Sequence, residues 1–167
     1  MRYSELFDDM IEFDVELNPI PVTDGRDKDV TVNFKMFNGF DPAQKFYADQ
    51  NGLELQEHHI QYIPSNYTFL NNKSYPNYHM VSGNFVPVET AIMMRDQNKS
   101  SLQVTVMNDR TQAGAADLTD KATIELMQQR RGLLDDQKGL GEAMNETERI
   151  DVKPPRIHAN YFMQIFD

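Results

Sequence analysis

The sequence predicts an all-β protein with the architecture of a β-sandwich. Apolar residues recur at every second position in several short runs, Asn-Gly and Asp-Gly pairs separate these runs, and patterns typical of a helix are nearly absent. Six or more short strands joined by short turns are the usual make-up of a sandwich. We therefore expect a single β-sandwich region over residues 1–167.

Strands are expected where apolar and polar side chains alternate, because successive side chains of a strand point to opposite faces. In the run 11–17 the apolar residues share one face and three acidic residues share the other. The runs 30–36, 102–106 and 122–128 repeat this pattern. The predicted core consists of Ile11, Phe13, Val15, Val32, Phe34, Val104, Val106, Ile124 and Leu126.

Other segments alternate less clearly. The run 86–94 is apolar almost throughout, which predicts one strand covered on both faces. Residues 125–134 have helix-forming composition, but two glycines and an Asp-Asp pair follow closely, and we expect a strand that enters a loop. Residues 148–167 are predicted to form a return strand, and residues 1–10 a short helix or a tail.

The best hairpin candidate lies at Asn51-Gly52, between the short runs 46–47 and 53–55. Asn-Gly pairs readily adopt the positive φ angles that tight hairpins require.

Composition excludes several classes of protein. The chain has 16 basic and 26 acidic residues and a net charge of -10, which argues against a nucleic-acid partner because phosphate binding needs clustered Lys and Arg. No run approaches the roughly 18 apolar residues that a membrane span needs. Without cysteine, the chain has no disulfide, no thiolate zinc site and no cysteine nucleophile.

The residues alone indicate no reaction. His58 and His59 point to opposite faces of a strand, and no metal-chelating spacing occurs among the histidines, so we expect no metal in this chain. Four Asn-x-Ser/Thr patterns favour the secretory pathway and predict a glycoprotein. They begin at Asn66, Asn72, Asn98 and Asn145, and Asn145 is expected to be the most accessible because it follows the Gly139-Leu-Gly141 turn.

Several segments, in the same order, resemble motifs of one enzyme family. They are Asn-Pro-Ile-Pro-Val-Thr-Asp-Gly (18–25), Phe-Tyr-Ala-Asp-Gln-Asn-Gly (46–52), Gly-Asn-Phe-Val-Pro (83–87), Leu-Gln-Val-Thr-Val-Met-Asn-Asp-Arg (102–110) and, most closely, the segment 124–142 with Glu-Leu-Met-Gln-Gln-Arg-Arg and Asp-Asp-Gln-Lys-Gly. The family is the class II α-mannosidases, glycoside hydrolase family 38, most similar in the lysosomal branch. The chain departs from it at Lys138, where the family has Arg, and at Glu57-His58-His59, where arginines are usual.

The resemblance implies a portion of the galactose-mutarotase-like supersandwich that follows the catalytic domain of an α-mannosidase, and hence an incomplete fragment. The full enzyme would hydrolyse terminal α-D-mannosyl residues of N-glycans and oligosaccharides in the lysosome or secretory pathway. Its zinc and its catalytic carboxylates would lie in a catalytic α/β domain, so no catalytic residue and no cofactor is expected in this chain. The implied partners are that domain and a mannose-containing glycan. The residues that match the substrate-positioning loop are Arg130, Arg131, Asp136 and Lys138.

Two other functions stay open. A free-standing carbohydrate-binding β domain would need an exposed aromatic platform, for which the candidates are Tyr62, Tyr67, Tyr75 and Tyr78. The absence of a secretory signal at the N-terminus allows, as a third reading, a structural or interaction domain in the cytoplasm.

Overall fold

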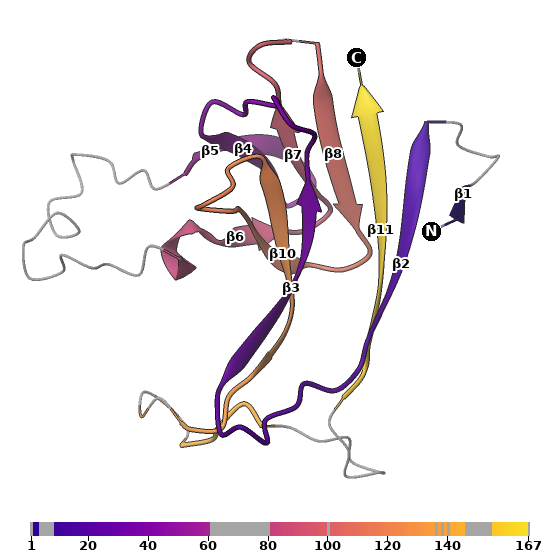
Figure 1. Cartoon of the computed structure of the whole chain (residues 1–167). Coiled ribbons are helices and arrows are strands. Elements are labelled where there is room, and N and C mark those ends of the chain that lie inside the picture. Colours follow the sequence, from indigo (N-terminus) through magenta and orange to yellow (C-terminus); the bar gives the residue numbers. More distant parts are fainter. Residues whose placement is uncertain are drawn as a thin grey trace, which may run out of the picture.

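The computed structural model describes residues 2–3, 9–60, 81–99, 101–135, 137, 139, 141–145 and 155–166. Over these residues the chain forms two antiparallel β-sheets that pack against each other, and the predicted all-β sandwich is confirmed (Figure 1). The described part of the larger sheet contains, in spatial order, β1 (Arg2–Tyr3), β2 (Met10–Leu17), β11 (Ile157–Phe166), β8 (Gln103–Asn108), β7 (Ala91–Arg95), β4 (Lys45–Gln50) and β5 (Glu54–His59).

The smaller sheet has the order β3 (Lys28–Lys35), β10 (Thr123–Arg131), β9 (Gln112–Ala116) and β6 (Val86–Val88) among the described residues. A 3-10 turn, η1 (Ser82–Asn84), precedes β6. No helix in the described part of the chain is long and apolar enough to cross a membrane. Of the first ten residues, Arg2–Tyr3 and Met10 belong to strands, and residues 4–8 lie outside the described residues.

The core lies between the two sheets and follows the predicted alternation. Five of the nine predicted core residues are buried, namely Phe34, Val104, Val106, Ile124 and Leu126. Three more, Phe13, Val15 and Val32, are partly buried and pack against the core. Ile11 does not belong to the core cluster, because it pairs with the short edge strand β1 at the margin of the sheet.

Aromatic rings join the two sheets. The ring of Phe34 on β3 meets Phe13 on β2 and Tyr161 on β11 edge to face, with centroids 5.3 and 5.4 Å apart. Edge-to-face pairs at this separation contribute about 0.5–1.5 kcal/mol beyond the burial of their area. These contacts hold β3 over the β2–β11 pair and therefore position the end of the sandwich that β3 and β10 form.

The apolar run 86–94 is not one strand, and this prediction is wrong. It forms β6 and β7, which belong to different sheets, with the crossing at Glu89 and Thr90. The expected burial on both faces does occur in β7, where Ile92, Met93 and Met94 are all inaccessible. A run of apolar residues has the same pattern whether it stays in one sheet or bends into the next.

The bend is held by Asp49 at the end of β4. Its Oδ1 accepts hydrogen bonds from the backbone N–H groups of Glu89, Thr90 and Ala91 at 2.9, 2.8 and 3.1 Å. Burial on its own raises the pKa of Asp49, but the N–H donors, led by that of Thr90, outweigh it and keep the pKa below the usual 3.8.

The predicted hairpin at Asn51-Gly52 is confirmed. Both residues have positive φ, 52° and 66°, and Leu53 N donates to Gln50 O at 2.9 Å, so the turn is of the mirror-image type that suits the twist of paired strands. Gly52 N also donates to Asp49 Oδ2 at 3.0 Å. Asp49 thus ties the β4–β5 hairpin to the sheet crossing.

Candidate functional site

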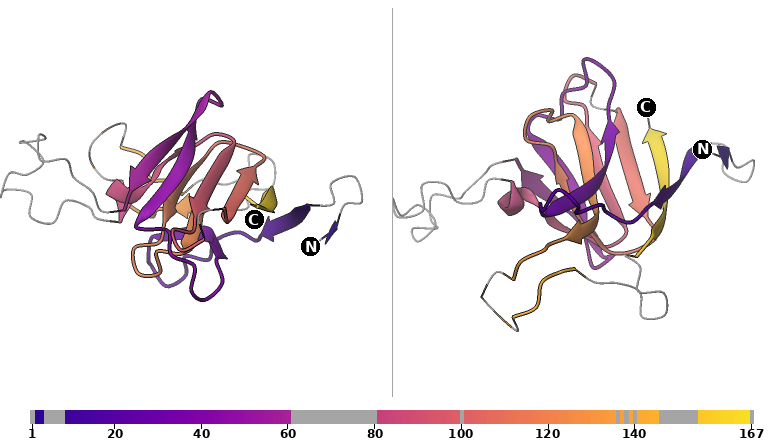
Figure 2. Two further views of the ribbon diagram at one scale, coloured as in Figure 1. Left: turned by 90° about the horizontal axis from the view of Figure 1, so that it is seen from above. Right: turned by 60° about the horizontal axis from the view of Figure 1, so that its bottom comes forward.

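The strand β10 carries Arg130 and Arg131 to the end of the sandwich. In Figure 1, β3 and β10 run side by side to the bottom of the view, and the segment that follows β10 projects away from the sheets in the right view of Figure 2. A bulge between Met127 and Gln129 shifts the register of β10 against β3. After the bulge Arg130 lies opposite Asp29, and Arg131 lies opposite Lys28.

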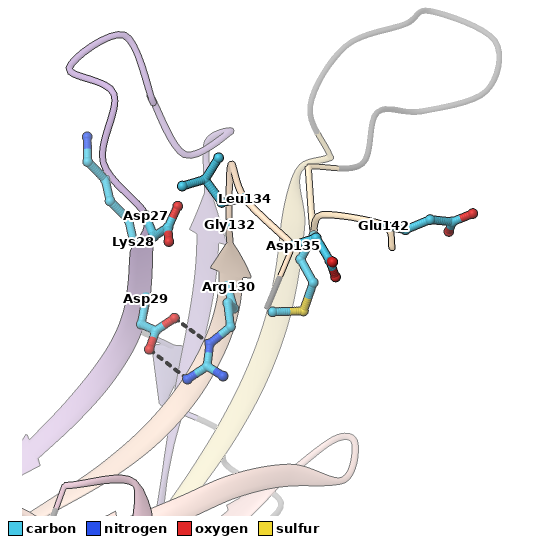
Figure 3. A pocket seen from close by; sticks show the side chains of 9 residues that line it. Asp27, Lys28, Asp29, Arg130, Gly132, Leu134, Asp135 and Glu142 are labelled. Atoms are coloured by element: carbon cyan, nitrogen blue, oxygen red, sulfur yellow. Dashed lines mark hydrogen bonds and ion pairs between the residues drawn. The ribbon is translucent and has the colours of Figure 1, made fainter. Parts of the chain in front are cut away.

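Arg130 forms a two-pronged ion pair with Asp29. Its Nε donates to Oδ1 at 2.6 Å and its Nη2 donates to Oδ2 at 2.8 Å, as the dashed lines in Figure 3 mark. The hydrogen bonds that Arg130 donates to Asp29 raise the pKa of Arg130 above its usual value, against a smaller opposing effect of burial. The two side chains are 46% and 43% exposed, so the pair orients the guanidinium more than it stabilises the fold.

Arg131 makes different contacts. Its Nε donates to Asn145 Oδ1 at 2.8 Å, and its Nη1 donates to the carbonyl of Ile20 at 2.6 Å. It therefore joins the end of β10 to Ile20, 111 residues away, and to Asn145, 14 residues away. Each of the two predicted positioning arginines donates two hydrogen bonds within the chain, and of the two only Arg130 borders the cavity described next.

A cavity of about 520 Å³ opens at this end of the sandwich, beside the Asp29–Arg130 pair. Its lining residues are Asp27, Lys28, Asp29, Arg130, Gly132, Leu134, Asp135, Glu142 and Met144 (Figure 3). Asp27 Oδ1 accepts from Leu133 N at 2.7 Å, and Asp135 Oδ2 accepts from Gln137 N at 2.9 Å. The Glu142 side chain points away from the Arg130 pair.

The structure does not describe two of the four predicted positioning residues. Asp136 and Lys138 lie outside the described residues, so the positioning hypothesis can be examined only at Arg130 and Arg131. The candidate aromatic platform, Tyr62, Tyr67, Tyr75 and Tyr78, also lies outside them.

The histidines of the described residues are dispersed. His58 stacks on Phe46 with ring centroids 5.1 Å apart, and burial lowers its pKa from the usual 6.5. His59 pairs with Glu57 at 2.9 Å, and His158 pairs with Asp14 at 2.5 Å. Within the described ranges no three His, Asp or Glu side chains gather as a metal site would require. The donor set of these residues therefore does not fit zinc.

Of the four sequons, two begin in the described part of the chain. Asn98 and Asn145 are both exposed, whereas Asn66 and Asn72 lie outside the described residues. Sequence reasoning treated Asn145 only as a glycan acceptor and missed its bond to Arg131. It also missed Asp29, because the pairing of Asp29 with Arg130 depends on a bulge for which the residue pattern holds no signal.

The described residues thus define a class of module, an all-β sandwich with a basic pair and an open cavity at one end. Comparison with known proteins identifies its relatives. The chain is 38% identical to lysosomal alpha-mannosidase of Bos taurus over 136 residues, which is 81% of this chain, and 34% identical to that of Dictyostelium discoideum over 143 residues, which is 85%. An alpha-mannosidase of Arabidopsis thaliana is 29% identical over 156 residues, or 92% of the chain.

The resemblance to α-mannosidases is therefore confirmed, and this chain is a relative of one segment of the lysosomal-type enzymes. It spans only about 12–14% of the length of these relatives. No protein-family model matches the chain. The bovine match covers 136 of the 167 residues, or 81% of the chain. A match of this length includes positions 130 and 131 wherever in the chain it begins.

Proposed function

We propose that this chain serves as the non-catalytic β-module of an α-mannosidase and follows a zinc-dependent catalytic α/β domain. In this proposal the complete enzyme removes terminal α-D-mannosyl residues from N-glycans and oligosaccharides in the lysosome or the secretory pathway. The main support is that the chain matches lysosomal alpha-mannosidases over more than four fifths of its length, a span that contains the positions of the arginine pair at its open end.

The module's part in the reaction is to position substrate. The Asp29 carboxylate fixes two of the five N–H donors of Arg130, and the remaining donors can bind hydroxyl oxygens of a sugar. The cavity beside the pair, about 520 Å³, is large enough for one sugar ring. Besides charged side chains, the cavity is lined by the apolar side chains of Leu134 and Met144. This combination suits a sugar, which has both polar and apolar surface.

The acidic groups at the cavity support a non-catalytic role. Retaining glycosidases place two carboxyl groups about 5–5.5 Å apart across the scissile bond. Here Asp29 binds Arg130, while Asp27 and Asp135 bind backbone N–H groups. These three carboxylates therefore stabilise the local structure, and we assign the hydrolysis to the catalytic domain.

The test is a segment exchange. The matching segment of bovine lysosomal alpha-mannosidase is replaced by this chain, and hydrolysis of an aryl α-mannoside is measured beside the parent enzyme and beside an enzyme lacking the segment. We expect the exchanged enzyme to retain activity and the deleted enzyme to lose it. If the exchanged enzyme folds, binds zinc and yet is inactive, the chain is not an α-mannosidase module. Tight binding of mannose oligosaccharides by the isolated chain would favour the free-standing carbohydrate-binding function instead.

A further inference from the structure

Three segments of the chain meet at the guanidinium of Arg131. Ile20 follows β2, Arg131 ends β10, and Asn145 follows the segment after β10. The Nε–Oδ1 distance to Asn145 is 2.8 Å and the Nη1–O distance to Ile20 is 2.6 Å. The planar guanidinium can serve both acceptors at once because its N–H groups diverge in a fixed plane, which an ammonium group cannot reproduce.

Backbone bonds next to Arg131 bring the ends of the following segment together. Gly132 N donates to Met144 O at 3.0 Å, so the chain that leaves β10 returns to its starting point twelve residues later. Leu133 N donates to Asp27 Oδ1 at 2.7 Å, which ties the same place to the residues before β3. We call these contacts of Arg131, Gly132, Met144 and Asn145 the neck of the 132–144 segment.

The side chain of Asn145 takes part in the neck through its amide oxygen. Its carbonyl Oδ1 accepts from Arg131, whereas N-linked glycans are attached at the amide nitrogen Nδ2. The exposed side chain can therefore carry a glycan and keep its bond to Arg131. A hydrogen bond from a charged donor is among the stronger kinds. Asn145 Oδ1 is the acceptor of the one that Arg131 Nε donates.

We infer that Asn145 is a positioning residue, whose amide carbonyl holds Arg131 and closes the neck of the 132–144 segment independently of any glycan on its sequon. The segment contains the sequence positions of Asp136 and Lys138, and Arg130 precedes it. Fixing the neck orders the cavity side of the module. The effect on turnover rests on the proposed function, whereas the closure of the neck does not.

The test uses three variants of this chain that separate the carbonyl from the glycan. Asn145→Leu removes the acceptor and the sequon. Asn145→Asp removes the sequon but supplies a carboxylate oxygen to Arg131. Thr147→Ala removes the sequon and leaves Asn145 in place. Amide hydrogen exchange at Gly132 reports the neck, and thermal unfolding reports the fold as a whole.

We expect exchange at Gly132 to rise about tenfold or more in Asn145→Leu and to stay near the parent value in Asn145→Asp and Thr147→Ala. Arg131→Lys is the second probe of the neck and is expected to raise exchange in the same way, because it keeps the charge and loses the fork. Unchanged exchange in both Asn145→Leu and Arg131→Lys overturns the inference. Thr147→Ala behaving like Asn145→Leu also overturns it, because the glycan would then be the active part.

Turnover distinguishes this inference from the proposed function. In the segment-exchanged enzyme we expect Asn145→Leu to lower kcat/KM about tenfold and Asn145→Asp to restore it, since misplacement of a substrate-positioning element is costly. If Gly132 exchange rises while kcat/KM is unchanged, the neck stands and the positioning role of the segment fails. If the parent exchange enzyme itself is inactive, the proposed function fails and the exchange measurements still decide the neck.

Discussion

The carboxylate of Asp49 accepts the backbone N–H of Thr90 at 2.8 Å, at the point where the chain leaves one sheet for the other. The two residues are 41 positions apart, and the carboxylate satisfies three consecutive N–H groups that strand pairing leaves without partners in the bend. Asp49 also lies at the start of the Asn51-Gly52 turn. One side chain therefore links a hairpin to a change of sheet.

Replacing Asp49 by Asn is expected to destabilise the protein by about 3 kcal/mol, because the amide NH₂ would face N–H donors and hydrogen bonds to a charged acceptor would be lost. Urea unfolding measures the loss. Asp117→Asn is the matched control, since Asp117 accepts only local N–H groups of Thr119 and Asp120. Equal losses in the two variants would contradict the anchoring role of Asp49.

Asp49 also predicts a pH dependence. Its pKa is lowered in the folded protein, so its contribution to stability is complete above the unfolded value of 3.8 and is lost as the pH falls through the lower folded value. We expect the parent protein to lose more stability than Asp49→Asn over that acidic range. Parallel stability curves for the two proteins would show that the carboxylate is not the group responsible.

Gly114 is expected to tolerate no side chain. A Cβ atom at this position would lie 2.6 Å from Val88 Cγ2 and 3.0 Å from Leu126 Cδ2, both of which are buried. Gly114→Ala should therefore lower the unfolding free energy by about 1–3 kcal/mol, as overpacking does. Gly139→Ala, with no atom within 4 Å of the added Cβ, is expected to change it by less than about 0.5 kcal/mol. The comparison is made by thermal unfolding, and a neutral Gly114→Ala would mean that β6 and β9 shift apart easily.

Arg130 is expected to matter for turnover more than for stability. Because its pair with Asp29 is exposed, Arg130→Lys should cost less than about 1 kcal/mol in unfolding free energy. In the segment-exchanged mannosidase the same change should lower kcat/KM about tenfold to a hundredfold, since an ammonium cannot keep the two-pronged geometry.

Arg110 offers a matched control for this experiment. It forms a similar two-pronged pair with Asp109 at 2.8 and 3.0 Å, but the cavity lining does not include it. Arg110→Lys should leave kcat/KM unchanged. Similar losses in both variants would indicate a general effect of arginine pairs on folding and not a role at the cavity.

His58 is expected to weaken the fold as the pH falls. Burial lowers the pKa of His58 below 6.5, so the unfolded chain binds the proton more readily than the folded protein does. The contribution of neutral His58 to stability is therefore complete above the unfolded pKa. It declines as the pH falls through 6.5 toward the folded value. His58→Phe keeps the stack on Phe46 and should lose less stability between about pH 7 and about pH 5 than the parent protein does. His59→Phe, at an exposed position, serves as control. A parent-like pH profile in His58→Phe would exclude this origin.

The isolated chain is expected neither to hydrolyse aryl α-mannosides nor to hold zinc stoichiometrically. Three of the acids that border the cavity, Asp27, Asp29 and Asp135, bind Arg130 or backbone N–H groups. Of the described histidines, His58 and His59 are neighbours on β5, where successive side chains point to opposite faces, and His158 lies on β11. Metal analysis after dialysis and a long hydrolysis assay test both statements. One tightly held zinc per chain would contradict the proposal that the zinc and the hydrolytic chemistry belong to a separate catalytic domain.

What the sequence by itself determined is the local structure and the family. Alternation predicted β2, β3, β8 and β10, because a strand's side chains alternate wherever the strand is placed, and Asn51-Gly52 predicted its hairpin because the turn depends on two φ angles. The motifs around Arg130 and Arg131 likewise needed no structure to indicate the α-mannosidases. These features depend on residues close together in the chain.

The tertiary structure alone decided which distant residues meet. The break of the run 86–94 into two sheets depends on Asp49, the partner of Arg130 is 101 residues away, and the Ile20 carbonyl that binds Arg131 is 111 residues away. Such contacts follow from strand order and from the bulge in β10, which place residues by register across sheets and leave no periodic trace in the sequence. The bond between Arg131 and Asn145 at the neck is therefore a property of the fold, although the sequence singles out both residues for other reasons.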